Sequence, residues 1–291
     1  MRRNCIVTTF SIVAADLATG DLGIAVASKF LACGAVVPWA RAGAGAVATQ
    51  SYANTAYGPD AIRMMRDGLS AQEALVRLLV DDADRDLRQV GLVDARGGAA
   101  AHTGPGCHAW AGHRVGDGFT CQGNILVGQE TVEAMADAFQ ASKGALASRL
   151  VTALAAGEKA GGDKRGKQAS ALYVVRPKGG YGGMNDVLVD LRVDDHPEPV
   201  AELVRLLDLR DLYFGTSPAA EKLKIEGAVL ADLKRLMILK GFYHGDASGP
   251  WDQATRQALD AFIASENFEE RIDLKKRTID APVLTYLRGR L

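Results

Sequence analysis

The chain has 291 residues, of which 48% are hydrophobic, so it is long enough for two domains and apolar enough for a sizeable core. Its 34 Lys and Arg residues nearly balance its 35 Asp and Glu residues, and the net charge of −1 excludes the broad basic field that nucleic-acid binding uses. No uninterrupted apolar run reaches the ~18 residues of a membrane span, so no membrane partner is expected.

The cysteines and the first residues bear on compartment and cofactors. Cys5, Cys33, Cys107 and Cys121 are far apart and form no CxxC pair, so neither a metal site nor a disulfide framework is expected. The apolar stretch after the first five residues is interrupted by threonine, serine and aspartate, which favours a strand over a signal peptide. We therefore expect a cytoplasmic protein without a cofactor.

Residues 6–193 alternate short apolar strands with glycine-rich turns and helices. Three pairs of strands are expected to form hairpins: residues 6–14 with 22–28, 89–94 with 99–103, and 170–176 with 187–193. A further single strand is expected at residues 45–51. The first pair is apolar at nearly every position, which suits strands covered on both faces.

Helices are expected between these hairpins. Pro59 suits the first turn of a helix that ends before Gly68, and Ser70 with Glu73 has the spacing of a capping box. Further helical patterns cover residues 132–139, 146–156 and 199–212. Strands and helices thus come in blocks, which favours antiparallel sheets with separate helix layers over a doubly wound parallel sheet.

The loop Gly161–Gln168 combines three glycines with four charged side chains just before the strand at residues 170–176. One interpretation is an ordinary charged hairpin loop. The other is a binding loop, in which Arg165 holds a carboxylate of a small substrate and Asp163 holds an amine.

Composition changes at residues 213–224. We expect one domain over residues 1–215, a linker over residues 216–224 and a small helical domain over residues 225–291. The last domain has about 67 residues, a marginal size for independent stability, so docking on the larger domain is expected.

Several segments of the N-terminal part match a known family. They are Thr9–Ala14, Val26–Phe30, Thr49–Asn54, Arg88–Gly91, Cys107 with Trp110–Gly112, Gln122–Leu126, Gly161–Gly166 and Asp190–His196. Together they resemble a bacterial family of unassigned function that is placed in the Ntn (N-terminal nucleophile) hydrolase fold, and they cover most of residues 9–210. The resemblance implies an α+β fold, a four-layer αββα sandwich, with the small helical domain appended, and it implies a homodimer.

Ntn hydrolases attack an amide carbonyl with a Thr, Ser or Cys at the mature N-terminus, whose own α-amine takes the proton. The resemblance makes Thr9 this nucleophile, at the head of the first strand. A free Thr9 amine requires cleavage between Thr8 and Thr9 or a later translation start. The alternative is that Thr9 is an ordinary β-branched strand residue.

The matched segments supply further candidate residues. Asn54 and Asn124 are candidate oxyanion donors, and the alternative for each is a turn-forming residue. Ser51 joins Asp163 and Arg165 as a candidate substrate-binding residue. Elsewhere, a thiol and two histidines close together are too few for a convincing site, and structural roles are expected for them: Cys107, His108 and His113.

Residues 229–270 resemble a peptidoglycan-binding-like domain. The matching pattern is Leu233–Leu239, Gly241–Tyr243, Gly249–Trp251, Thr255–Leu259 and Phe262. Aromatic residues in such a loop can stack on sugars or close a small core, and we expect the core role for Tyr243 and Trp251. Docking is expected rather than cell-wall binding.

The leading hypothesis is a cytoplasmic amidohydrolase, acting on the C–N bond of a small amide substrate. A second hypothesis is a non-catalytic protein that binds a small metabolite, for which Asp163 and Arg165 matter and Thr9 does not. The third is a cell-wall-associated binding protein.

Overall fold

A computed structural model describes residues 9–291 of the chain. Cys5 and Thr8, on which two of the expectations rest, lie outside the described residues. The described residues divide into two compact units, an N-terminal unit that ends at Leu207 and a C-terminal unit over residues 208–291. From residue 9 onward, no helix combines the length and the apolar character needed to cross a membrane.

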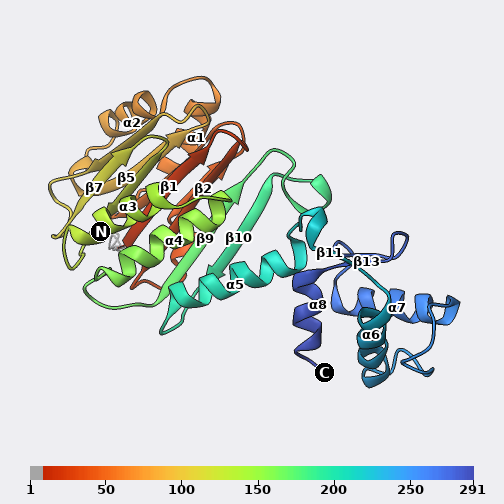
Figure 1. Ribbon diagram of the computed structural model, residues 1–291. Coiled ribbons are helices and arrows are strands. Elements are labelled where there is room, and N and C mark those ends of the chain that lie inside the picture. The colour runs from red at the N-terminus through yellow and green to blue at the C-terminus, as the bar shows by residue number, and fades with distance from the viewer. Residues whose placement is uncertain (1–8) are drawn as a thin grey trace. The chain divides into compact units, whose positions relative to one another are not determined.

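Two antiparallel sheets form the frame of the N-terminal unit (Figure 1). The six-stranded sheet has the order β10-β9-β2-β1-β8-β7, and its strands in chain order are β1 (Thr9–Asp16), β2 (Asp21–Ser28), β7 (Gly112–Gly116), β8 (Phe119–Gly123), β9 (Ala169–Val175) and β10 (Val187–Val193). The four-stranded sheet has the order β3-β4-β5-β6, with β3 (Pro38–Arg41), β4 (Gly45–Ser51), β5 (Arg88–Asp94) and β6 (Ala99–Thr103).

The two sheets face each other, because β1 contacts β4 and β5, and β8 contacts β5. Two helices cover the outer face of the four-stranded sheet: α1 (Tyr57–Arg66) and α2 (Ala71–Val80). The outer face of the six-stranded sheet is covered by α3 (Glu130–Ala141) and α4 (Leu146–Lys159), on the other side of the unit in Figure 1. The unit is therefore a mixed α+β structure with antiparallel sheets and separate helix layers, and α5 (Pro199–Phe214) follows the last strand.

Local sequence signals correspond to local structure. The three expected hairpins are present as β1–β2, β5–β6 and β9–β10, and β2 is buried at every position. The expected capping box starts α2, where Ser70 Oγ accepts from the Glu73 N–H at 3.2 Å and the Glu73 carboxylate accepts from the Ser70 N–H at 2.8 Å. Three strands were not expected: β3, β7 and β8.

The C-terminal unit packs three helices around one apolar core, and a small sheet was not foreseen from the sequence. Its helices are α6 (Gly227–Leu239), α7 (Gln253–Glu266) and α8 (Ala281–Arg288). Its sheet has the order β11-β13-β12, with β11 (Lys222–Lys224), β12 (Ile272–Asp273) and β13 (Thr278–Asp280). Tyr243 belongs to this core and Trp251 packs against it, so the core role expected for both aromatic residues is confirmed.

A buried lysine holds the glycine-rich loop between α6 and α7. Lys234 is fully buried, and its ammonium group donates to the carbonyl oxygens of Gly249 and Pro250 at 2.9 Å each. It also lies 5.1 Å from the ring centroid of Tyr243, within range of a cation–π interaction. A buried charge is tolerated when it is hydrogen-bonded in this way.

Candidate functional site

The layer between the two sheets changes from apolar to polar along β1. Side chains alternate between the faces of a strand, so Phe10 and Ile12 point into the core beneath α3 and α4, while Val13 joins the apolar core between the sheets. Thr9 and Ser11 share the inter-sheet face with Val13, and both are fully buried. The start of β1 therefore places hydroxyl groups where an ordinary sandwich has aliphatic side chains.

Three fully buried glutamines surround these hydroxyls, one from each of β4, β5 and β8: Gln50, Gln89 and Gln122. The Ser11 hydroxyl donates to Gln50 Oε1 at 2.6 Å and accepts from Gln122 Nε2 at 2.7 Å. Gln50 Nε2 in turn donates to Gln89 Oε1 at 2.9 Å. The network joins the two sheets by hydrogen bonds, and it marks this end of the sandwich as the candidate site.

Sequence reasoning assigned no role to these glutamines or to Ser11. The available signal was a glutamine inside each of three apolar strands, because an amide at such a position needs hydrogen-bond partners once the strand is buried. All three glutamines fall within the segments that carry the family resemblance.

Thr9 is held on both sides at the edge of this network. Its hydroxyl donates to Ser28 Oγ at 3.2 Å across the β1–β2 ladder, where the two residues are register partners. Its carbonyl oxygen accepts from Gln50 Nε2 at 3.2 Å and from the Asn124 N–H at 3.0 Å. Backbone and side chain are thus fixed by partners from three different segments.

Asn124 follows β8 and is fully buried beside Thr9. Its Nδ2 group donates to Gln89 Oε1 at 2.8 Å, which uses one of the two hydrogens that this group carries. Its Oδ1 atom has no hydrogen-bond partner in the part of the chain that the structure describes. Asn124 therefore brings one amide hydrogen and one carbonyl oxygen to the Thr9 end of the sheet.

Ser51 ends β4 in a left-handed conformation, with φ 67°, and its side chain is buried. A non-glycine residue rarely adopts this backbone region, and such positions occur often at functional sites. Burial raises the pKa of the neighbouring Cys107 thiol, which donates to the Arg88 carbonyl oxygen at 3.4 Å. The Cys107 thiol is thus protonated at neutral pH.

The histidine beside this thiol is engaged elsewhere. His108 Nε2 lies 3.2 Å from the Tyr52 hydroxyl, whereas the Cys107 thiol donates to the Leu87 and Arg88 carbonyl oxygens, which suits the structural roles expected for both residues. Across residues 9–291, no group of three or more His, Cys, Asp or Glu side chains is arranged to hold a metal ion.

Asn54 has partners other than Thr9. It lies in the loop before α1, where its Nδ2 donates to Asp82 Oδ2 at 3.3 Å and its Oδ1 accepts from the Ala56 N–H. Asp82 also forms a partly buried ion pair with Arg88 at 2.8 Å, and Arg88 donates to the Tyr52 carbonyl at 2.7 Å. The contacts of Asn54 are therefore those of a residue that shapes the loop after Ser51.

The loop with Asp163 and Arg165 lies next to two segments that contact Thr9. Asp163 pairs with Leu126 in a β-bridge, and its Oδ2 accepts from the Lys29 N–H at 3.1 Å, directly after Ser28. The Asp163 carboxylate also binds Arg165, with Oδ2 2.6 Å from Nη2 and Oδ1 3.0 Å from Nε. The Asp163 side chain is 1% exposed and that of Arg165 is 35% exposed, so a buried carboxylate fixes a guanidinium that reaches the surface.

Comparisons with known proteins match both parts of the chain. The model of a family described as "Family of unknown function (DUF1028)" matches residues 9–203, and that of a "Putative peptidoglycan binding domain" matches residues 218–287. A similar solved structure is that of protein SPO2555 from Silicibacter pomeroyi, of family DUF1028, with 32% identity and a TM-score of 0.64. The match covers 74% of this chain and 89% of that chain. A search of curated proteins found no match.

Proposed function

The chain belongs to the family of unknown function DUF1028, and from the contacts of Thr9 we propose that its N-terminal unit is an Ntn-type amidohydrolase on a four-layer αββα sandwich. The observation that carries the proposal is that the Thr9 carbonyl oxygen accepts two hydrogen bonds, from Gln50 and Asn124, at the polar end of the layer between the sheets. A nucleophile needs a fixed backbone and a hydroxyl within hydrogen-bond reach of other polar groups. Thr9 has both, since its hydroxyl contacts Ser28.

In this proposal, cleavage between Thr8 and Thr9 frees the α-amine of Thr9. An α-amine has a pKa of about 7.7–8.0, so part of it is unprotonated at neutral pH and accepts the hydroxyl proton. Thr9 Oγ1 then forms a bond to the substrate carbonyl carbon, the C–N bond breaks, and the leaving nitrogen takes that proton. Water hydrolyses the resulting ester and restores Thr9.

The surrounding residues receive the remaining roles. The second amide hydrogen of Asn124 stabilises the oxyanion, a contribution for which one donor is commonly worth about 3–4 kcal/mol. Arg165 holds a substrate carboxylate, and Asp163 fixes its guanidinium rather than binding an amine, because Arg165 and Lys29 use its oxygens. Ser51 contacts the substrate, and Asn54 stabilises the loop that follows Ser51.

Intact-mass measurement and N-terminal sequencing of the purified chain test the proposal. We expect a species that begins at Thr9 and hydrolyses members of a library of small amides. Thr9→Ala should abolish both, Thr9→Ser should retain both, and Thr19→Ala, at an exposed turn position, should change neither. A chain that keeps residues 1–8 and hydrolyses an amide equally well with Thr9→Ala would overturn the assignment.

A non-catalytic metabolite-binding protein is the second candidate, and the guanidinium fixed by Asp163 is the observation that favours it. Thermal-shift screening with small carboxylates distinguishes the two. Stabilisation that survives Thr9→Val and vanishes with Arg165→Ala, in a chain without amide-hydrolysing activity, would favour binding alone.

A further inference from the structure

Strand β10 is an edge of the six-stranded sheet, because it pairs with β9 on one side and ends the strand order (Figure 1). Its register is regular over Val189–Val193, after a bulge between Val187 and Val189. Within the described part of the chain, the backbone groups of this regular segment form no hydrogen bond to any element other than β9. An edge with unpaired N–H and C=O groups is a surface on which a strand of another chain can extend the sheet.

The two faces of β10 differ in character. Val189 and Val193 belong to the apolar core that includes α4, and Leu191 packs against that core. Side chains alternate along a strand, so Asp190 and Arg192 lie on the opposite face. Arg192 Nε lies 2.8 Å from Asp190 Oδ1, and the two side chains are 43% and 38% exposed. The regular segment therefore has three apolar positions on one face and two accessible, opposite charges on the other.

This segment is complementary to a second copy of itself. A two-fold axis perpendicular to a sheet places two copies of an edge strand side by side in antiparallel order. With the axis at Leu191, Asp190 of each copy lies opposite Arg192 of the other, and Val189 lies opposite Val193. Residues directly opposite in an antiparallel pair have Cβ atoms about 4.5–5.5 Å apart, which is close enough for ion pairs and apolar contacts.

Other symmetric registers fit less well. Opposite residues must share a face of the sheet, so the axis passes through a residue rather than between two. An axis at Asp190 or at Arg192 places two like charges directly opposite each other, which is destabilising. An axis at Val189 or at Val193 extends the pairing beyond the regular segment, into the bulge or past the end of the strand. Leu191 is the centre that uses all five regular positions and opposes no like charges.

Exposed apolar side chains adjoin this edge. Tyr181 and Met184 lie in the loop that leads into β10, and they are 84% and 88% exposed. Large apolar side chains that lie close together on a surface often mark an interaction site. The loop therefore adds apolar surface next to the strand edge.

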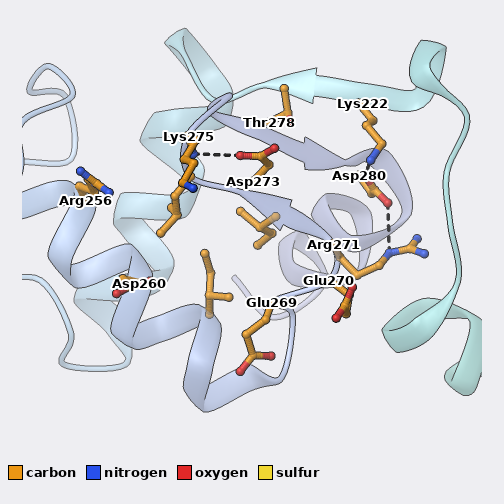
Figure 2. A pocket seen from close by; sticks show the side chains of 13 residues that line it. Lys222, Arg256, Asp260, Glu269, Glu270, Arg271, Asp273, Lys275, Thr278 and Asp280 are labelled. Atoms are coloured by element: carbon orange, nitrogen blue, oxygen red, sulfur yellow. Dashed lines mark hydrogen bonds and ion pairs between the residues drawn. The ribbon is translucent and has the colours of Figure 1, made fainter. Parts of the chain in front are cut away.

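Ion pairs inside one unit do not have the same implication. In a pocket of about 480 Å³ in the C-terminal unit, Asp280 lies 3.2 Å from Arg271 and 3.7 Å from Lys222 (Figure 2). The side chains of Asp280 and Arg271 are each 3% exposed, so they serve the structure of that unit. Asp190 and Arg192 differ because they are accessible and lie on a strand edge.

We propose that two copies of the chain form a dimer through β10, in antiparallel register centred on Leu191. The two six-stranded sheets then form one continuous sheet, and the backbone groups at both edges are paired. On one face, Asp190 and Arg192 of the two copies form a network of four charges. On the other face, Leu191 packs against Leu191 of the second copy, with Val189 and Val193 beside it.

Sedimentation velocity of the full chain over a range of concentrations tests the proposal. We expect a monomer–dimer equilibrium with a Kd on the order of 10 µM. Asp190→Arg and Arg192→Asp each place like charges opposite one another twice in the interface, so each should weaken the dimer about tenfold or more. The double variant with both changes restores opposite charges and should dimerise about as well as the wild type. Asp60→Arg and Arg63→Asp, the same changes in an exposed pair on α1, should leave the Kd unchanged.

Two further measurements test the register and the location. In an equimolar mixture of Asp190→Arg and Arg192→Asp chains, opposite charges face each other at every charged position, so the mixture should dimerise more tightly than either variant alone. Hydrogen exchange of a β10 peptide should slow as the protein concentration rises, while that of a peptide from β7, the other edge of the sheet, should not. Circular dichroism confirms that each variant is folded. A chain that stays monomeric, a dimer that tolerates the single charge reversals, or one that the double variant does not restore would overturn the proposal.

Discussion

Gln89 is the residue on which the polar network between the sheets most depends. Its side-chain amide donates to Thr103 Oγ1, Gly112 O and Gly123 O, and its Oε1 accepts from Gln50 and Asn124. Gln89→Leu keeps the approximate side-chain volume and removes all of these bonds. Gln50 still donates to Thr9, but Asn124 Nδ2 and the Gly123 carbonyl, 2.7 Å from Gln89 Nε2, lose this partner inside the protein.

The expected cost follows from the hydrogen bond that each of these two buried groups loses. A buried polar group without a partner costs about 1–3 kcal/mol, and the larger apolar surface of leucine returns about 1–2 kcal/mol. Two such groups together cost about 2–6 kcal/mol, so we expect Gln89→Leu to lower the free energy of unfolding of the N-terminal unit by up to about 5 kcal/mol, with a central value of about 2.5 kcal/mol. Gln72→Leu, the same change at an exposed position of α2, should stay within about 0.5 kcal/mol of the wild type.

Hydrogen exchange of peptides from β4, β5 and β8, measured by mass spectrometry along a urea series, reports on the N-terminal unit alone. Asn124→Leu in the Gln89→Leu background tests the reasoning further. Because Asn124 is already orphaned there, the double variant should be at least about 1 kcal/mol more stable than the sum of the single effects predicts. Strict additivity, or a loss for Gln89→Leu no larger than that of Gln72→Leu, would refute the assigned role.

Three further predictions concern the charged and strained residues. Burial by itself raises the pKa of Asp82, but hydrogen bonds, above all from Arg88, outweigh it and hold the pKa well below its usual range. The stabilisation by the Asp82 carboxylate is therefore complete above the pKa of about 3.9 in the unfolded chain, and it is lost as the pH falls toward the pKa in the folded protein. Urea midpoints of the wild type and of Asp82→Asn should consequently differ most at pH 7 and converge as the pH falls below about 4. Lys234→Met leaves the loop carbonyls without their donor and should destabilise the C-terminal unit by about 2–4 kcal/mol in urea unfolding, against almost no change for the exposed Lys240→Met. Because Ser51 has φ 67°, Ser51→Gly should lower the free energy of unfolding by less than about 1 kcal/mol, and Ser51→Val should lower it by more than about 2 kcal/mol. Equal melting temperatures for the two variants would contradict this expectation.

Features encoded within a few residues could be predicted from the sequence. The capping box of Ser70 and Glu73 depends on one helical turn, and the hairpins depend on strands joined by short connections. In each case the interacting residues are neighbours in the chain, so composition and spacing determine the outcome.

The glutamine network could not be predicted in the same way. Gln50 and Gln89 are 39 residues apart, and Gln122 reaches Ser11 across 111 residues. Which strands face one another depends on the packing of two sheets, and a glutamine in an apolar strand does not reveal its partner. Asn54 illustrates the converse. Like Asn124, it follows a strand within the segments that carry the family resemblance. Its side-chain amide nevertheless donates to Asp82, and no pattern within the loop indicates that contact.

The ion pair between Asp163 and Arg165 agrees with the carboxylate-binding role proposed for Arg165, but not with the amine-binding role expected for Asp163, whose oxygens bind Lys29 and Arg165. Asp163 directs its oxygens to Lys29 and Arg165, which ties the loop to the segment after Ser28. An ion pair with one partly exposed member contributes only about 0–1 kcal/mol to stability. The main effect of the ion pair is to orient the Arg165 guanidinium, which is hydrogen-bonded through two of its nitrogens. Because the side chain has already lost most of its rotamer freedom, binding of a carboxylate costs less conformational entropy. Arg165→Lys, which keeps the charge and loses the planar fork, should therefore weaken carboxylate binding nearly as much as Arg165→Ala.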